Sequence, residues 1–172
     1  VQAMQPFLKD AWIRWKKDGQ QVIIGLIPTP AFEEAEERLG YRPIERTPLD
    51  LYRFANSRDK GISFRTALGA KANATLMVGD ASGTKSSNGQ THAVYARLGM
   101  PVSEGLVADL YGDWSKKGVG QTWSTVKGEL FWQKNGSKAG LMLAAHRQKG
   151  SGPAYNVTVA SLYGESKGAF AG

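Results

Sequence analysis

The feature that most constrains this chain is an Asn-Gly pair between two long runs of apolar residues. Asn135 and Gly136 separate residues 121–133 from residues 138–147. Both residue types accept the positive φ angles that a two-residue hairpin turn requires. A Gly, Ser and Pro segment at 149–153 then leads into a third run at 155–163. Residues 121–163 are therefore predicted to form a three-stranded antiparallel meander.

Shorter runs of the same kind precede the meander. In residues 62–68, apolar Ile62, Phe64 and Leu68 alternate with Ser63 and Arg65, which predicts a strand with one buried face. Several other short segments are rich in β-branched or aromatic residues, which favour strands. The strands predicted before residue 121 are 21–27, 49–54, 62–68, 74–78 and 92–98.

Three segments carry apolar residues at a spacing of four, which is typical of an amphipathic helix. The first is 5–18, and the second is 30–39, which begins after a Pro-Thr-Pro sequence. The third is 101–117, with Leu106, Leu110 and Trp114 in one line. The predicted fold class is α+β: one domain over 1–172, with a mostly antiparallel sheet and about three packing helices. Its first helix lies within 1–19, and a Gly-rich tail at 165–172 is expected to be loose.

Composition narrows the chemistry more than it narrows the function. The chain has 172 residues, 41% hydrophobic and 22% charged, which suits a globular domain. It has no cysteine, which excludes disulfides, thiolate metal sites and a cysteine nucleophile. No apolar run approaches the roughly 18 residues of a membrane-crossing helix, so no transmembrane segment is predicted. The compartment stays open, with a periplasmic or secreted location after processing as one alternative.

A formal net charge of +7 raises the question of a polyanionic partner. Lys and Arg are spread along the chain, which also fits a role in solubility alone. Tryptophans interleaved with basic residues are nevertheless the chemistry of a surface that stacks bases and contacts phosphates. The candidate binding residues are Trp12, Trp15, Lys16, Lys17, Lys85, Trp123 and Trp132.

The Gly- and Ser-rich segment at 79–91 resembles a phosphate-binding loop only in composition. Three residues separate Gly79 from Gly83, where the Walker pattern needs four, and Thr84 stands between Gly83 and Lys85. A strand is predicted after it, whereas a phosphate loop needs a helix. We interpret the segment as an exposed loop that either contacts a partner or only connects two strands.

No arrangement of catalytic residues emerges from the sequence. Ser82 with His92 and either Asp80 or Asp109 is the only triad worth testing. Asp109 and Asp113, at a spacing of four, could form a carboxylate pair only across a cleft. Whether these groups and His146 converge depends on the fold. No metal-ligand spacing is present, and no cofactor is predicted.

The sequence thus favours a non-enzymatic binding or accessory domain that recognises a protein partner or a larger assembly. One alternative is a polyanion binder, with nucleic acid as the ligand, that uses the basic and tryptophan-rich surfaces. The other is a hydrolase whose site is assembled only in the fold. The oligomeric state is left open.

Overall fold

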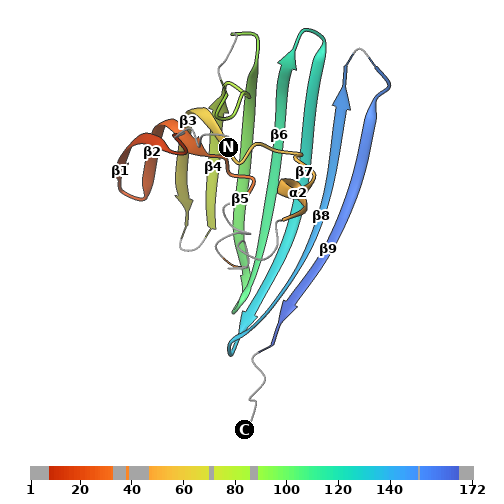
Figure 1. Ribbon diagram of the computed structural model, residues 1–172. Coiled ribbons are helices and arrows are strands. Elements are labelled where there is room, and N and C mark those ends of the chain that lie inside the picture. The colour runs from red at the N-terminus through yellow and green to blue at the C-terminus, as the bar shows by residue number, and fades with distance from the viewer. Residues whose placement is uncertain are drawn as a thin grey trace, which may run out of the picture.

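The computed structural model describes residues 8–32, 38, 47–69, 72–85, 89–150 and 152–166. These residues form one antiparallel sheet of nine strands, and the order of strands across the sheet is their order in the chain (Figure 1). One short helix, α2 (Pro48–Leu51), lies between the second and third strands. The strands are β1 (Ala11–Lys17), β2 (Gln20–Pro28), β3 (Arg58–Leu68), β4 (Ala72–Gly79), β5 (His92–Ser103), β6 (Leu106–Gly118), β7 (Gln121–Lys134), β8 (Ser137–Lys149) and β9 (Tyr155–Glu165).

The connections at the two ends of the strands differ in length. The turns β1–β2, β5–β6, β6–β7 and β7–β8 each have two residues; β5–β6 and β7–β8 lie at the lower edge in Figure 1, and β6–β7 lies at the upper edge. The edge with the β6–β7 turn also carries the longer connections, residues 29–57 between β2 and β3 and residues 80–91 between β4 and β5. In the Asn135-Gly136 turn both residues have positive φ, 52° and 80°, as the hairpin prediction requires.

Each strand has one buried and one exposed face, with a period of two. In β8, the even-numbered residues from Gly140 to His146 are buried and the odd-numbered ones are exposed. Pairing without bulges through most of the sheet keeps this alternation in phase from strand to strand. The sheet therefore has an inner, covered face and an outer, exposed face.

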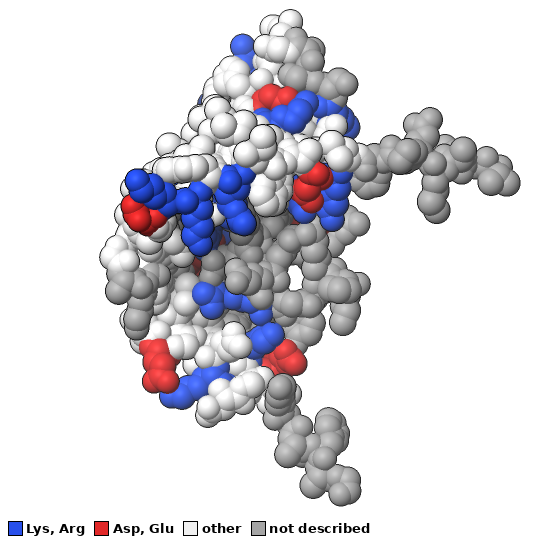
Figure 2. Space-filling model, turned by 90° about the vertical axis from the view of Figure 1, so that its left-hand side faces the viewer, with Lys and Arg blue, Asp and Glu red and all other residues white. Residues whose placement is uncertain are grey.

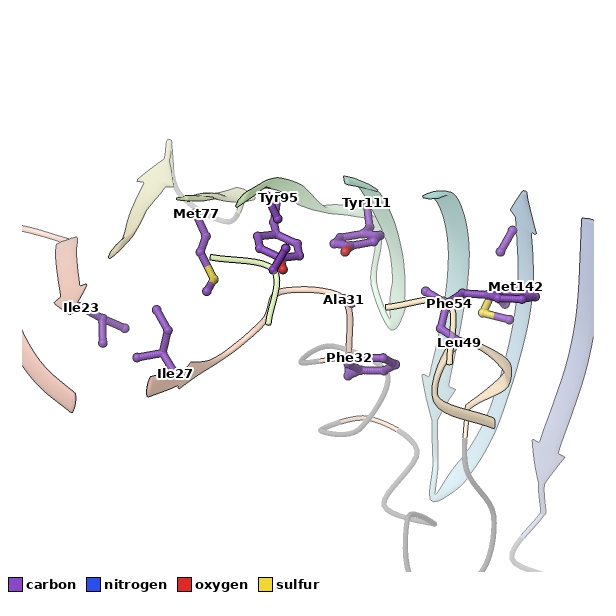
Figure 3. Packing of buried hydrophobic residues seen from close by; sticks show 13 residues of the cluster. Ile23, Ile27, Ala31, Phe32, Leu49, Phe54, Met77, Tyr95, Tyr111 and Met142 are labelled. Carbon is purple, nitrogen blue, oxygen red and sulfur yellow. The ribbon is translucent and has the colours of Figure 1, made fainter. Parts of the chain in front are cut away.

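The core lies between the inner face and the β2–β3 connection. The strands form an arc, and the buried side chains fill the space between the arc and the described parts of the connection (Figure 3). From the connection come Ala31, Phe32, Leu49 and Phe54. Ala81 comes from the β4–β5 connection, and from the strands come Ile23, Ile27, Met77, Ala93, Tyr95, Tyr111, Met142 and Ala144.

The prediction of an α+β fold with about three packing helices was wrong. The first predicted helix, 5–18, contains strand β1, and the third, 101–117, covers the end of β5 and most of β6. A spacing of four fits two strand repeats as well as about one helical turn, so Leu106, Leu110 and Trp114 share a strand face. A helix would also need apolar residues at intervals of three and seven, where the chain has Asp109 and Asp113.

The remaining boundaries agree more closely. The predicted strand 49–54 was wrong, because residues 48–51 form α2, which starts with Pro48 at its first position. The predicted strands 21–27, 62–68, 74–78, 92–98 and the meander were confirmed within β2, β3, β4, β5 and β7–β9. Most of the predicted helix 30–39 lies outside the described residues, as does most of the tail, although Glu165 ends β9.

Candidate functional site

The inner face carries a network of buried charges. Arg97 on β5 pairs with Asp109 on β6, with 2.6 Å between Nε and Oδ1. Lys127 on β7 lies 3.5 Å from the other oxygen of Asp109 and forms an ion pair with Glu129. Arg97 also donates a hydrogen bond of 2.8 Å to Asn73 on β4. Two cations thus face two anions across β5, β6 and β7, which offsets the cost of burying each charge.

Lys127 joins this network to the β2–β3 connection. Its Nζ donates a hydrogen bond of 2.9 Å to the carbonyl oxygen of Ala31. Its ammonium group therefore donates hydrogen bonds to Glu129 and Ala31, and the Asp109 carboxylate adds an ion pair at 3.5 Å. The side chain of Lys127 is 2% exposed, so water does not replace a missing acceptor there without a rearrangement.

The connection has two arms, one that follows β2 and contains Ala31 and one that leads into β3 and contains Phe54. A second set of contacts holds the arm that leads into β3. The ring of Phe54 stacks on His146 of β8, with ring centres 4.4 Å apart and planes at 8°. The Thr125 hydroxyl donates to the Phe54 carbonyl oxygen at 3.3 Å and lies 3.0 Å from His146 Nδ1. Gln148 donates to His146 Nε2 at 3.1 Å, so Nδ1 carries the proton of the neutral imidazole.

At the edge with the long connections, Asp59 fastens the β4–β5 connection. Its carboxylate accepts hydrogen bonds from the backbone N–H groups of Ala81 (2.8 Å) and Gly83 (3.1 Å) and from the Tyr95 hydroxyl (2.7 Å). A Cβ atom at Gly79 would collide with this carboxylate, which explains a glycine at that position.

Asp80, next to this anchor, sits among several hydrogen-bond partners. Burial alone would raise the pKa of Asp80, but hydrogen bonds from Lys60, from Ser82 and from the Asp59 carboxyl group outweigh burial and lower the pKa to about 2. Asp59 can donate this bond when protonated, because burial raises its own pKa to about 6. Lys60 also forms an ion pair with Asp80 at 2.9 Å and donates to the Lys85 carbonyl oxygen at 2.7 Å. The carboxylate of Asp80 therefore stays charged throughout the ordinary pH range.

The outer face is apolar over a broad band. On β6 every outward residue from Leu106 to Trp114 is uncharged, and the same holds on β7 from Val126 to Trp132. Many large side chains there are well exposed, including Leu143 at 54% and Val126 at 61%. From the side of β1 and β2, Lys and Arg form separate patches with wide uncharged areas between them (Figure 2). The large exposed apolar residues of the outer face include Ile13, Trp15, Ile24, Ile62, Phe64, Leu76, Val78, Val94, Leu110, Trp114, Val126, Leu130, Trp132, Leu141, Leu143 and Leu162.

The predicted binding residues do not form one surface. Trp15 and Lys17 follow the outward register of β1, whereas Trp12 and Lys16 follow the inward register. Trp132 also faces outward. Trp123 is on the inner side, where the Lys117 ammonium lies 5.1 Å from its ring centre and His146 meets its edge. Lys85 lies in the β4–β5 connection.

The predicted catalytic groups are brought together only in part. Ser82 donates to Asp80 at 2.7 Å, but His92 follows the outward register of β5 and contacts the Trp114 ring, with centres 5.5 Å apart. Asp109 is engaged with Arg97, and Asp113 accepts a hydrogen bond of 2.6 Å from Tyr111. In the ranges that the structure describes, no group of three or more His, Asp or Glu residues is arranged to hold a metal ion.

Arg97, Lys127 and Glu129 are the inner-face residues that the sequence interpretation missed. Their signal is a charged residue at alternate positions of an otherwise apolar strand, as in Val126, Lys127, Gly128, Glu129, Leu130. Such a pattern indicates one polar and one apolar face, and here the polar face is the buried one.

Comparisons with known proteins assign the chain to no family and to no function. The chain matches no protein-family model, no curated protein and no solved structure. Over the residues that the structure describes, no helix has the length and apolar character needed to cross a membrane.

Proposed function

We propose that the sheet forms part of the wall of a membrane-spanning passage for polar solutes. The outer face lies against lipid hydrocarbon, and the inner face, partly covered by the β2–β3 connection, is on the side of the passage. One observation carries the proposal: large apolar side chains are exposed on one face, while ionisable side chains are buried on the other. In a water-soluble sheet the arrangement is the reverse, with the apolar face buried and the polar face in solvent.

The dimensions of the apolar band support this assignment. On β6 it extends from Leu106 to Trp114, which is about 26 Å along a strand at roughly 3.3 Å per residue. A tilt of about 40° shortens this to about 20 Å across the bilayer, close to the roughly 25 Å apolar band of membrane-spanning strands. Outward-facing tryptophans mark the ends of the band on two strands: Trp114 towards the long connections and Trp132 towards the short turns. Aromatic side chains are favoured at both bilayer interfaces.

Backbone hydrogen bonding fits the same environment. Lipid offers no hydrogen-bond partner, so every strand within it must be paired on both sides. Among the described residues, β2 to β8 each have two neighbours, and β1 and β9 are the edges. The proposal therefore requires that the edges of β1 and β9 are also paired in the membrane. One edge has only short turns, and both long connections, 29–57 and 80–91, lie at the other edge beside the short β6–β7 turn, which resembles the usual asymmetry of such walls.

The experiment is tryptophan quenching by brominated phospholipids. Variants that keep one of the five tryptophans, with Phe at the other four, are reconstituted into vesicles. We expect lipid bromines to quench Trp114 and Trp132, which face outward. Trp123, on the inner face, is the matched control and should keep its emission. Equal quenching of all three, or of none, would contradict the proposal.

A second function has support from the same apolar face, namely the predicted recognition of a protein partner. A large apolar surface is also what an obligate protein interface presents. This function requires a chain that stays dispersed in water without detergent and whose Trp114 and Trp132 are insensitive to brominated lipid. A polyanion-binding surface has weaker support, because neighbouring Trp15 and Lys16 lie on opposite faces of β1.

A further inference from the structure

We infer that Lys127 is the positioning residue that fixes the described part of the β2–β3 connection inside the arc, so that this part limits the width of the passage. The statement about the width of the passage rests on the proposed function, whereas the anchoring of the connection by Lys127 does not. It is carried by the hydrogen bond between Lys127 Nζ and the carbonyl oxygen of Ala31.

The connection has three separate contacts with the inner wall. Ala31 is held by Lys127 of β7. Phe54 is held by His146 and Thr125. Between these two arms, the guanidinium of Arg38 lies 5.9 Å from the ring centre of Phe131 on β7. All three contacts are made with β7 and β8, so both arms of the connection reach the same part of the arc.

The two ends of the connection are also tied to each other. The backbone N–H of Thr29 donates to the Ser57 carbonyl oxygen at 3.2 Å, and the Thr29 hydroxyl donates to that of Asn56. The connection therefore starts and ends at one point on the edge of the sheet that carries the long connections. Figure 3 shows its buried residues, including Phe32 and Leu49, inside the arc of strands.

Of these contacts, the one made by Lys127 would cost the most free energy to lose if the connection moved away from the wall. When the connection is docked, the ammonium donates hydrogen bonds to Glu129 and to the Ala31 carbonyl, and it lies 3.5 Å from the Asp109 carboxylate. If the Ala31 carbonyl moves away, a buried charge loses one acceptor, at a cost larger than that of losing a neutral hydrogen bond. Glu129 and Asp109 hold the ammonium in place from the strand side, so the connection and not the lysine must adjust.

A direct variant such as K127M leaves Glu129 without its cation and risks misfolding. The double variant K127M/E129Q removes one positive and one negative charge together and leaves the Arg97–Asp109 pair in place. The single variant E129Q is its matched control, since it keeps the lysine, its Asp109 partner and its bond to Ala31. K127R keeps the charge and the donors, and serves as the conservative rescue.

Because the chain has no cysteine, spin labels can be placed without background. Labels on L51C in α2 and V119C in the β6–β7 turn occupy two exposed positions, on the connection and on the wall. Pulsed electron resonance on the full chain in vesicles should give one narrow distance distribution for the parent, E129Q and K127R. We expect K127M/E129Q to give a broad distribution. A narrow distribution in the double variant would overturn the anchoring role.

The same vesicles can be used to measure how fast a solute crosses the membrane through the passage. We expect the rate of efflux of a small neutral sugar to be severalfold higher in K127M/E129Q than in the parent, E129Q or K127R. Equal efflux, or none in any variant, would overturn the claim that the connection limits the passage. Brominated-lipid quenching of Trp114 in these samples separates the two failures. If Trp114 is quenched and efflux is equal, only this inference fails. If Trp114 is not quenched, the membrane assignment fails.

Discussion

The ring of Tyr163 on β9 lies over the Cα atom of Gly140, its cross-strand partner on β8. A side chain at Gly140 has no room, because a Cβ atom there would overlap the Tyr163 ring and hydroxyl. The aromatic ring covers backbone that the glycine leaves bare, an arrangement known to compensate for glycine in strands. The pair also closes the inner face beside Phe131, whose ring centre is 6.1 Å from that of Tyr163.

This pair gives the first prediction. G140A should lower the free energy of unfolding by about 1–3 kcal/mol, because the ring of Tyr163 must move. Urea unfolding in detergent micelles measures the change. The control is G112A, at a glycine of β6 where the nearest atom to an added Cβ would be at 3.8 Å. Equal effects of the two substitutions would show that the loss of glycine, and not the overlap, sets the cost.

The buried charge network gives the second prediction. D109N leaves Arg97 and Lys127 with less negative charge, and should cost about 3–5 kcal/mol of stability. The double variant R97M/D109L removes the 2.6 Å pair as a unit and should cost less than D109N alone. Unfolding in urea compares both with the parent. A double variant as unstable as D109N would mean that packing, and not charge compensation, dominates at this site.

The third prediction concerns the outer face. L143R places a charge in the apolar band of β8 and should destabilise the membrane-inserted state by about 2–4 kcal/mol. T66R introduces the same side chain on the outer face of β3, where Thr66 is paired with Gln20, and should cost at most about 1 kcal/mol. Refolding into phospholipid vesicles measures both. The idea fails if L143R inserts as readily as T66R.

The fourth prediction is a pH dependence from Asp80. Its folded pKa of about 2 lies below the ordinary value of 3.8, so the folded state binds the proton less readily than the unfolded state. Asp80 therefore contributes stability above pH 4, and this contribution is lost as the pH falls from about 4 to about 2. We expect D80N to flatten the stability curve in that window. E104Q, at an exposed position of the β5–β6 turn, is the control variant with the same change of charge.

The meander could be predicted because its signals are local. The Asn-Gly turn, the Gly-Pro loop and the alternation in residues 62–68 each depend on a few adjacent residues. The strand containing Leu106, Leu110 and Trp114 was missed because a spacing of four satisfies both periodicities. Only the charged residues between these positions distinguish the two, and Asp109 and Asp113 were interpreted as an acid pair on a helix.

The candidate site was harder to predict than the fold, for a geometric reason. Arg97, Asp109 and Lys127 meet because the hairpin registers place them in adjacent rows. A shift of one residue in either register would turn one of these side chains to the other face. The contact between Lys127 and Ala31 has no local signal at all, since it depends on a main-chain carbonyl of a connection that folds inward.

The order of strands also sets the order in which the molecule can assemble. Every strand pairs with its neighbour in sequence, so the sheet can grow hairpin by hairpin, with short loop closures except at residues 29–57 and 80–91. The anchors of the connection are different: Ala31 and Lys127 are 96 residues apart, and Phe54 and Thr125 are 71 apart. Ala31 and Phe54 cannot make these contacts until β7 has been synthesised. A nascent chain therefore passes through an open arc, and the interior is filled only when the seventh strand arrives.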